Sequence, residues 1–185
     1  MIAVSQSSMQ MNVVFPDESP SDPETVTAYI AQRYREIFDA FAIIKGVNAL
    51  FFGVTTQVHV PTHLPDQELL KRLARHLLKS PEETRGGYFD VQVKQTKIID
   101  KKLFHNITLA NYRVYKFDAL PDAVPRFPMS KVVERGVEII GDVNDRHAYN
   151  RQQAYRTSIV TAGDIVGLAM SSTGEAIAQV KAMAE

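Results

Sequence analysis

Apolar residues recur every three or four positions in some stretches of the chain and every second position in others. The clearest helical stripe lies between Ser21 and Gly46, with apolar residues spaced four, four, three, four and three positions apart. Pro23 and Glu24 suit the first turn of a helix, and Gly46 suits its end. The spacing therefore predicts one long amphipathic helix. Its apolar face consists of Val26, Ile30, Tyr34, Ile37, Phe41 and Ile44.

Alternating stretches follow this helix and surround a second one. In residues 47–60, VNALFFGVTTQVHV, apolar and polar side chains alternate as they do in a half-buried strand. Leucines recur every four positions within residues 66–79, which indicates a helix whose other side is basic. Residues 88–100 alternate again, and residues 103–118 form either one bent strand or a tight pair hinged in the middle.

Turn-forming residues divide the rest of the chain. The prolines of LPDAVPRFP predict a loop, followed by helices at 130–140, about 146–160 and 164–184. The last helix is rich in glycine, alanine and serine, so it can pack closely on the core or on a partner subunit. MNVVF, residues 11–15, predicts a short strand near the N-terminus. The predicted organisation is a flexible N-terminal segment (1–20), an α+β core domain (21–118), a Pro-rich connecting loop (119–129) and a helical C-terminal extension (130–185).

These elements predict an α+β fold: an antiparallel-rich sheet of about four strands, helices packed on one face, then the helical extension. The composition, 45% apolar and 23% charged, is typical of a globular protein. The absence of cysteine excludes disulfides, a thiolate nucleophile and cysteine-ligated metals. The chain has no long apolar run and no secretory signal pattern at its N-terminus. We expect a cytoplasmic protein with no membrane contact, no metal and no cofactor.

The net charge is zero, but the charges are unevenly distributed along the chain. Residues 1–70 hold eight acidic and three basic residues, whereas residues 71–102 hold four acidic and nine basic ones. The basic segment suits an anion such as nucleic acid, or an acidic surface of another subunit. Tyr88 and His105 offer stacking surfaces for bases. The candidate nucleic-acid contacts are Lys71, Arg72, Arg75, Lys79, Lys94, Lys97, Lys101 and Lys102.

Two strand-like stretches carry a histidine followed three positions later by a threonine, His59 with Thr62 and His105 with Thr108. VHVPTHL and FHNITLA resemble the paired His-x-Thr motifs of the two-histidine phosphoesterase superfamily, whose strands direct both histidines at one phosphate. The resemblance implies a phosphoesterase site built from these four residues. The spacing here is one residue longer, so a regular strand directs the members of each pair to opposite faces. The alternative is a set of strand residues with ordinary polar contacts.

A second enzyme-like pattern involves acidic residues near the basic segment. Asp66 follows a proline, and Asp90, Gln92 and Lys94 share one face of a predicted strand. Metal-dependent nucleases use carboxylates to hold magnesium and a lysine beside the scissile phosphate. Gln92 stands where the second carboxylate is needed, so the match is partial. The alternative is a polar, solvent-facing strand edge.

The chain contains no glycine-rich phosphate loop, no dinucleotide-binding glycine motif and no nucleophile elbow. We therefore expect a non-enzymatic binding or assembly module that is homo-oligomeric and able to bind a protein partner. A nucleic-acid-binding accessory protein that uses residues 71–102 is the first alternative. A small-molecule binder or an enzyme, such as a phosphoesterase, is the second.

Overall fold

The computed structural model describes residues 2–4, 9–15, 23–43, 48–78, 87–116 and 129–184. Its helices are α1 (Pro23–Ile43), α2 (Asp66–Leu73), α3 (Arg146–Arg151) and α4 (Ile159–Ala184). Its strands are β1 (Ile2–Val4), β2 (Met9–Met11), β3 (Gly53–Pro61), β4 (Gln92–Ile99), β5 (Leu103–Tyr115) and β6 (Val132–Asn144). The predicted α+β class is confirmed. None of the helices in these ranges is long and apolar enough to span a membrane.

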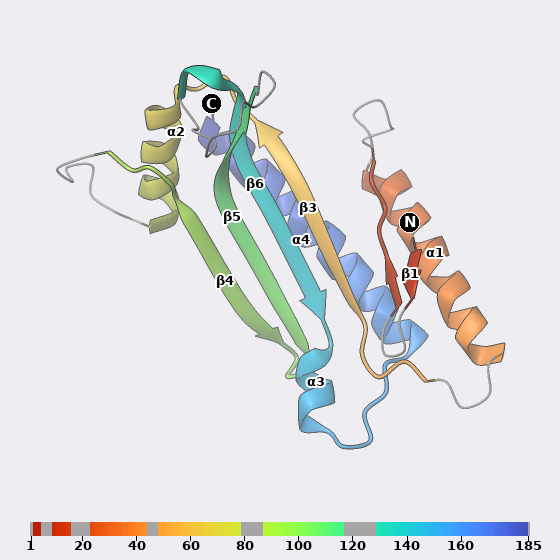
Figure 1. The fold of residues 1–185 in the computed structure, drawn as a ribbon. Coiled ribbons are helices and arrows are strands. Elements are labelled where there is room, and N and C mark those ends of the chain that lie inside the picture. Colours follow the sequence, from red (N-terminus) through yellow and green to blue (C-terminus); the bar gives the residue numbers. More distant parts are fainter. Residues whose placement is uncertain are drawn as a thin grey trace, which may run out of the picture.

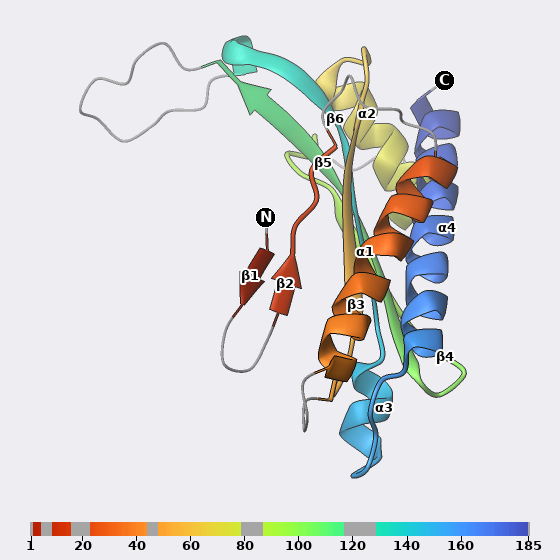
Figure 2. The same ribbon diagram turned by 90° about the vertical axis from the view of Figure 1, so that its right-hand side faces the viewer.

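Four antiparallel strands form one sheet in the order β3-β6-β5-β4. α2 and α4 lie on one side of this sheet, and α1 packs against α4 beside the β3 edge (Figures 1 and 2). β6 is central and pairs with β3 from Gly53–Asn144 to Pro61–Gly136. The other side of β6 pairs with β5 over a longer stretch. β1 and β2 pair only with each other, in a separate two-stranded sheet.

The hydrophobic core lies between the helices and one face of the sheet, here called the covered face. β6 contributes Val137, Ile139 and Val143, all almost fully buried. α4 packs on β3 and β6, while α2 covers the end of the sheet where β4 begins (Figure 1). Apolar burial of this kind stabilises the fold by roughly 1.5–3 kcal/mol for each large side chain. The covered-face positions are Val54, Thr56, Val58 and Val60 of β3, Val93, Gln95, Lys97 and Ile99 of β4, Leu103, His105, Ile107 and Leu109 of β5, and Val137, Ile139, Gly141 and Val143 of β6.

The predicted helix at 130–140 is wrong, because these residues form most of β6. The sequence VVERGVEIIGDVN is rich in β-branched residues, and its glycines would weaken a helix. In the sheet both glycines have a steric role. A Cβ at Gly136 would collide with the Val60 carbonyl oxygen, and one at Gly141 would crowd the hydroxyls of Thr56 and Thr173. The central strand β6 therefore requires glycine at positions 136 and 141, and the same two glycines make a helix unfavourable.

The boundaries of the other helices also differ from the predictions. α3 ends at Arg151, because Gln152 is extended, and a new helix begins at Ile159. The Ser158 Oγ accepts a hydrogen bond from the Thr161 N–H at 3.1 Å, which caps the start of α4. α2 continues as a π-helical turn to Leu78. The predicted helix residues Ser21, Ile44 and Lys79 lie outside the described residues.

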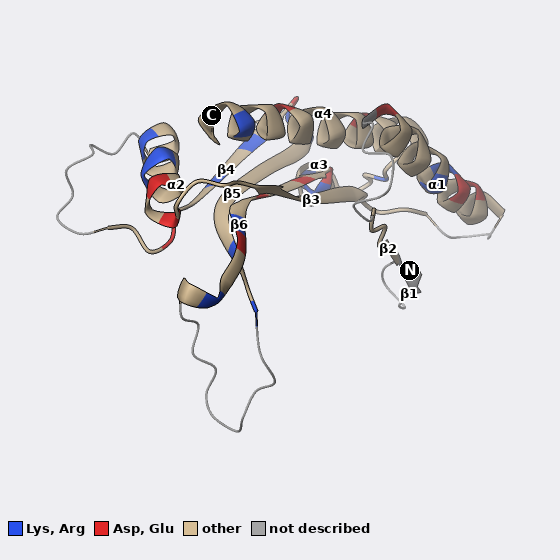
Figure 3. Cartoon of the chain, turned by 90° about the horizontal axis from the view of Figure 1, so that it is seen from above, with Lys and Arg blue, Asp and Glu red and all other residues tan. Residues whose placement is uncertain are grey.

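Two ribbons project from the side of the sheet opposite α4 (Figures 2 and 3). One is the β1-β2 hairpin. The other, here called the arm, consists of residues 112–116 and 129–134, where β5 and β6 extend past the ends of β3 and β4. The arm strands pair with each other and with no third strand of the described chain.

Candidate binding surface

The sheet face opposite the core, here called the open face, is covered by no helix of the described chain (Figure 3). Along every strand, residues of the open face alternate with residues of the covered face, because neighbouring residues of a strand point to opposite sides. Antiparallel partners point to the same side, so the register assigns its members. They are Gly53, Thr55, Gln57 and His59 of β3, Gln92, Lys94, Thr96 and Ile98 of β4, Phe104, Asn106, Thr108, Ala110 and Tyr112 of β5, and Glu134, Glu138, Ile140, Asp142 and Asn144 of β6.

Hydrogen bonds join three strands at the end of the open face nearest the arm. The Gln57 Nε2 donates to Glu138 Oε1 at 2.6 Å, and the His59 Nε2 lies 3.2 Å from the same oxygen. The His59 ring stacks on Tyr112 with 4.4 Å between ring centroids. The Tyr112 hydroxyl donates to Glu134 Oε1 at 2.7 Å. Burial, followed by this hydrogen bond, raises the pKa of the Tyr112 phenol.

A second polar group occupies the middle of the open face. Asp142 accepts hydrogen bonds from Asn106 Nδ2 at 2.9 Å and from Asn144 Nδ2 at 3.0 Å. The Thr96 hydroxyl donates to Asn106 Oδ1 at 2.8 Å, which extends the group to β4. No ion pair between described residues joins a lysine or arginine to the carboxylates of Glu134, Glu138 or Asp142. The centre of the open face is therefore acidic, and its carboxylates are oriented by neutral donors.

The end of the open face nearest α3 is aromatic and apolar. Phe51 lies 5.5 Å from Tyr149 between ring centroids, with the Arg146 guanidinium 5.6 Å from the Phe51 ring. The Phe104 and His147 rings form a T-shaped pair with 5.0 Å between ring centroids. Phe51, which precedes the edge strand β3, is exposed, and so is Ile98 on the opposite edge strand, β4. This end offers apolar contact area beside the acidic centre.

The outer part of the arm carries apolar and basic side chains, whereas Tyr112 and Glu134, at its base, belong to the open face. Val114, Met129 and Val133 are exposed, and Val133 retains 62% of its accessible surface. The Tyr115 hydroxyl lies 3.9 Å from the Met129 sulfur, a contact between β5 and the 3₁₀ turn Met129–Lys131 that precedes β6. Lys116 and Lys131, at the outer end of the described arm, are also exposed.

The structure separates the two predicted histidine–threonine pairs. His59 belongs to the open face, opposite Glu138, whereas His105 belongs to the covered face, opposite Val143. Thr108 points to the open face, as its three-residue spacing from His105 predicts. The Thr62 hydroxyl accepts a hydrogen bond from the Leu64 N–H at 3.2 Å. The two histidines therefore do not converge on one phosphate.

His105 is half-buried, and its Nε2 is buried without a hydrogen-bond partner in the described structure. Burial lowers the pKa of His105, and the positive charge of Lys97 lowers it further, while Glu175 of α4 opposes the change. These surroundings favour the neutral form of the His105 imidazole.

The basic residues of 71–102 do not gather on one side. Lys71 is exposed on α2, and Arg75 is exposed on the turn after it. Lys94 lies on the open face, whereas Lys97 lies on the covered face.

The other basic residues of the segment are also separated. Arg72 donates to Glu68 at 3.0 Å and to the Met183 carbonyl at 3.1 Å. Lys101 and Lys102 occupy the β4-β5 turn at the other end of β4, roughly 25 Å from α2 by strand length. Lys79 lies outside the described residues.

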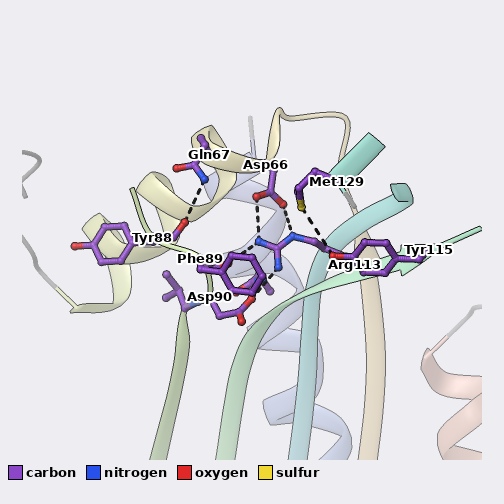
Figure 4. A network of polar contacts seen from close by, with 10 residues as sticks. Asp66, Gln67, Tyr88, Phe89, Asp90, Arg113, Tyr115 and Met129 are labelled. Atoms are coloured by element: carbon purple, nitrogen blue, oxygen red, sulfur yellow. Dashed lines mark hydrogen bonds and ion pairs between the residues drawn. The ribbon is translucent and has the colours of Figure 1, made fainter. Parts of the chain in front are cut away.

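Asp66 and Asp90 of the nuclease-like pattern do come together, but around an arginine (Figure 4). The Arg113 guanidinium binds both oxygens of Asp66, at 2.7 and 3.0 Å, and Asp90 Oδ1 at 2.8 Å. It also donates to the Phe89 carbonyl at 2.6 Å. These partners raise the pKa of Arg113, with Asp66 making the largest contribution. Arg113 thus ties the start of α2 to the segment that leads into β4, an assignment that the sequence pattern missed.

A buried carboxylate at the end of β6 connects two further segments by hydrogen bonds. Asp145 is fully buried, and its Oδ1 accepts a hydrogen bond from the Phe52 N–H at 2.7 Å. The Tyr155 hydroxyl donates to Asp145 Oδ2 at 2.7 Å. Burial and then this hydrogen bond raise the pKa of Tyr155 to about 12. Asp145 therefore anchors the segment before β3 and the segment before α4, which no local sequence pattern indicated.

Among the described residues no group of three or more His, Cys, Asp or Glu side chains is arranged to hold a metal ion. No family model matches the chain, and the searches of curated proteins and of solved structures return no match either.

Proposed function

We propose that the chain is a non-enzymatic assembly module that forms a homo-oligomer through the open side of its sheet. The observation that carries the proposal is the arm, which places Val114, Met129 and Val133 in solvent beyond the ends of β3 and β4. These residues contribute nothing to the core between the covered face and the helices. Apolar side chains on a projecting ribbon are typical of a surface that another protein chain covers.

The arm is also incomplete as a structural unit. Two-stranded ribbons are at best marginally stable in water, and independent stability needs a third strand or a packed layer. The arm has neither in the described chain, although its two strands remain paired with each other. A second copy that packs on the arm would provide the missing layer and remove its apolar side chains from water.

Nucleic-acid binding receives less support from the geometry. The exposed lysines and arginines of residues 71–102 are distributed over α2, both sides of β4 and the distant β4-β5 turn. The open face, which no helix of the described chain covers, carries three carboxylates and one lysine, so it would repel phosphates. Aromatic stacking residues without a positive surface do not suffice for a strand of nucleic acid.

Sedimentation velocity over a range of protein concentrations tests the proposal. We expect the wild-type chain to associate, and Val133→Glu to lower the association constant by at least about tenfold, because a charge would have to be buried in the interface. Val160→Glu is the matched control, since Val160 is an exposed valine at the start of α4, on the other side of the molecule. A wild-type chain that stays monomeric at about 100 μM, where most specific assemblies form, would contradict the proposal.

A further inference from the structure

We infer that two copies form a two-fold dimer in which the arm of each lies on the open face of the other. This inference rests on the proposed function and specifies its surface and partner. The arm is a projecting element whose outer end carries apolar and basic residues, and the open face, which no described helix covers, carries apolar and acidic residues that include Glu134 at the base of the arm. One chain therefore contains both halves of a complementary contact.

Charge complementarity favours this pairing of arm with face. The outer end of the described arm presents Lys116 and Lys131, and the open face presents Glu138 and Asp142. Both carboxylates are held in place by neutral amides or by the His59 ring, so each can accept a further hydrogen bond from a lysine without losing an arginine or lysine partner. Opposite potentials on the two elements direct the approach of the second copy and fix its orientation.

The same charges exclude the simplest alternative contact. Two open faces stacked directly on each other would oppose carboxylates to carboxylates, since Glu134, Glu138 and Asp142 outnumber Lys94 on this surface. Like charges directly opposed across an interface are destabilising. The lysines of the arms remove this conflict only if each arm reaches the face of the partner copy.

Apolar contacts complement the charged ones. Ile140 lies between Glu138 and Asp142 along β6 and points to the open face, and Phe104 and Ile98 follow toward α3. Val133 and Met129 of the partner's arm provide apolar surface to cover them. The contact thus has an apolar centre and a charged margin, the usual composition of a specific interface.

The position of the arm makes the contact reciprocal. Figure 2 shows the arm curving away from the sheet on the side opposite α4, so it extends beyond its own open face. A two-fold axis that brings two open faces together gives each copy one arm to donate and one face to accept the partner's arm. The two arm–face contacts of such an isologous dimer are identical, so a substitution in the arm or in the open face changes both contacts.

A charge-swap experiment tests this arrangement. The arm variant is Lys116→Glu with Lys131→Glu, and the face variant is Glu138→Lys with Asp142→Lys. Each variant alone would oppose like charges at both contacts, and we expect its dimer dissociation constant to rise on the order of 100-fold. An equimolar mixture would pair an acidic arm with a basic face and a basic arm with an acidic face. We therefore expect the mixture to regain dimers, read as a heterodimer mass by native mass spectrometry.

Matched controls carry the same changes elsewhere on the chain. Lys101→Glu with Lys102→Glu reverses two exposed lysines of the β4-β5 turn, and Asp39→Lys with Asp164→Lys reverses two exposed acids on the helices. Both controls are expected to dimerise as the wild type does, and far-ultraviolet circular dichroism confirms that all variants are folded. If the arm variant or the face variant dimerises normally, or if the mixture stays monomeric while the wild type dimerises, the inference is wrong and self-association uses another surface. A wild type that remains monomeric removes the proposed function as well.

Discussion

The two faces of the sheet are built from alternate residues of the same strands, yet different forces hold their side chains. On the covered face, Ile139 and Val143 are fully buried against α4 and the neighbouring strands. On the open face, the adjacent residues Glu138 and Asp142 remain in contact with water and form hydrogen bonds with neutral neighbours. Because exposed polar pairs stabilise proteins little, folding depends chiefly on the covered face. The open face and the arm are consequently available for interactions with another chain.

The largest expected difference concerns charge, and it compares an enclosed cation beside the start of α2 with an exposed cation on the open face. Arg113 is only 6% exposed in its side chain and binds Asp66, which is similarly enclosed. Arg113→Met would leave the Asp66 carboxylate without its cation, and we expect the free energy of unfolding to fall by about 3–5 kcal/mol. Lys94→Met removes a cation from the open face and should change stability by at most about 0.5 kcal/mol. Urea titration followed by circular dichroism measures both; equal losses would contradict the distinction.

Two consecutive isoleucines of β6 provide the sharpest apolar comparison. Ile139 is fully buried on the covered face, whereas Ile140 lies on the open face. Ile139→Ala would create a cavity against the helices and lower the free energy of unfolding by about 3 kcal/mol. Ile140→Ala should cost less than about 1 kcal/mol in the dilute chain, while it weakens self-association. Chemical denaturation at low protein concentration separates the two effects. If Ile140→Ala destabilised the chain as much as Ile139→Ala, the open face would belong to the core.

The pH dependence of stability sharpens the comparison through His105, which lies beneath α4 near Lys97 and Glu175. Its pKa is lowered below the value of 6.5 that it has in the unfolded chain. The unfolded chain therefore binds more protons at acidic pH, and this stability contribution is complete above about pH 6.5 and is lost as the pH falls through the folded pKa. We expect His105→Leu to lose less stability between pH 7 and pH 5 than the wild type. Parallel slopes for the two proteins in denaturation at each pH would contradict the assignment.

The smallest predicted effect lies in the β4-β5 turn, which belongs to neither face. Asp100 and Lys101 have φ angles of 49° and 55°, in the left-handed region that favours glycine. Lys101→Gly should raise the free energy of unfolding by about 0.5–1 kcal/mol and leave self-association unchanged, as measured by thermal melts and sedimentation. A loss of stability would show that the lysine side chain compensates for the backbone conformation.

Local patterns predicted part of this structure. The apolar stripe around Tyr34 predicted α1, because helical periodicity is visible within a few turns. The spacing of His105 and Thr108 predicted their opposite directions, which the register confirms. β6 was missed because the steric reason for its glycines lies in contacts with Val60 and Thr56, far away in the sequence.

The polar ties were missed for a related reason. Asp66 precedes Arg113 by 47 positions, and Asp90 precedes it by 23, so no local spacing links them. The basic segment was identified correctly as a sequence feature, but a strand directs alternate side chains to opposite faces, and Lys94 and Lys97 therefore separate. The acidic centre of the open face lies on β6, and the helix predicted at 130–140 covers Glu134 and Glu138 but not Asp142, so the sequence did not predict that the three share one sheet face.

Disulfide trapping tests the central claim most directly, because the natural chain contains no cysteine. Copies with Val133→Cys in the arm are mixed with copies of a different tag that carry Ile140→Cys on the open face, and the mixture is oxidised gently. Positions 133 and 140 are about 23 Å apart along one strand, too far for a disulfide within a chain. We predict rapid formation of the 133–140 heterodimer and little product when Ser171→Cys, on the outer side of α4, replaces Ile140→Cys. Equal trapping at position 171, or no trapping at position 140 in an associating protein, would contradict the arm-on-face dimer.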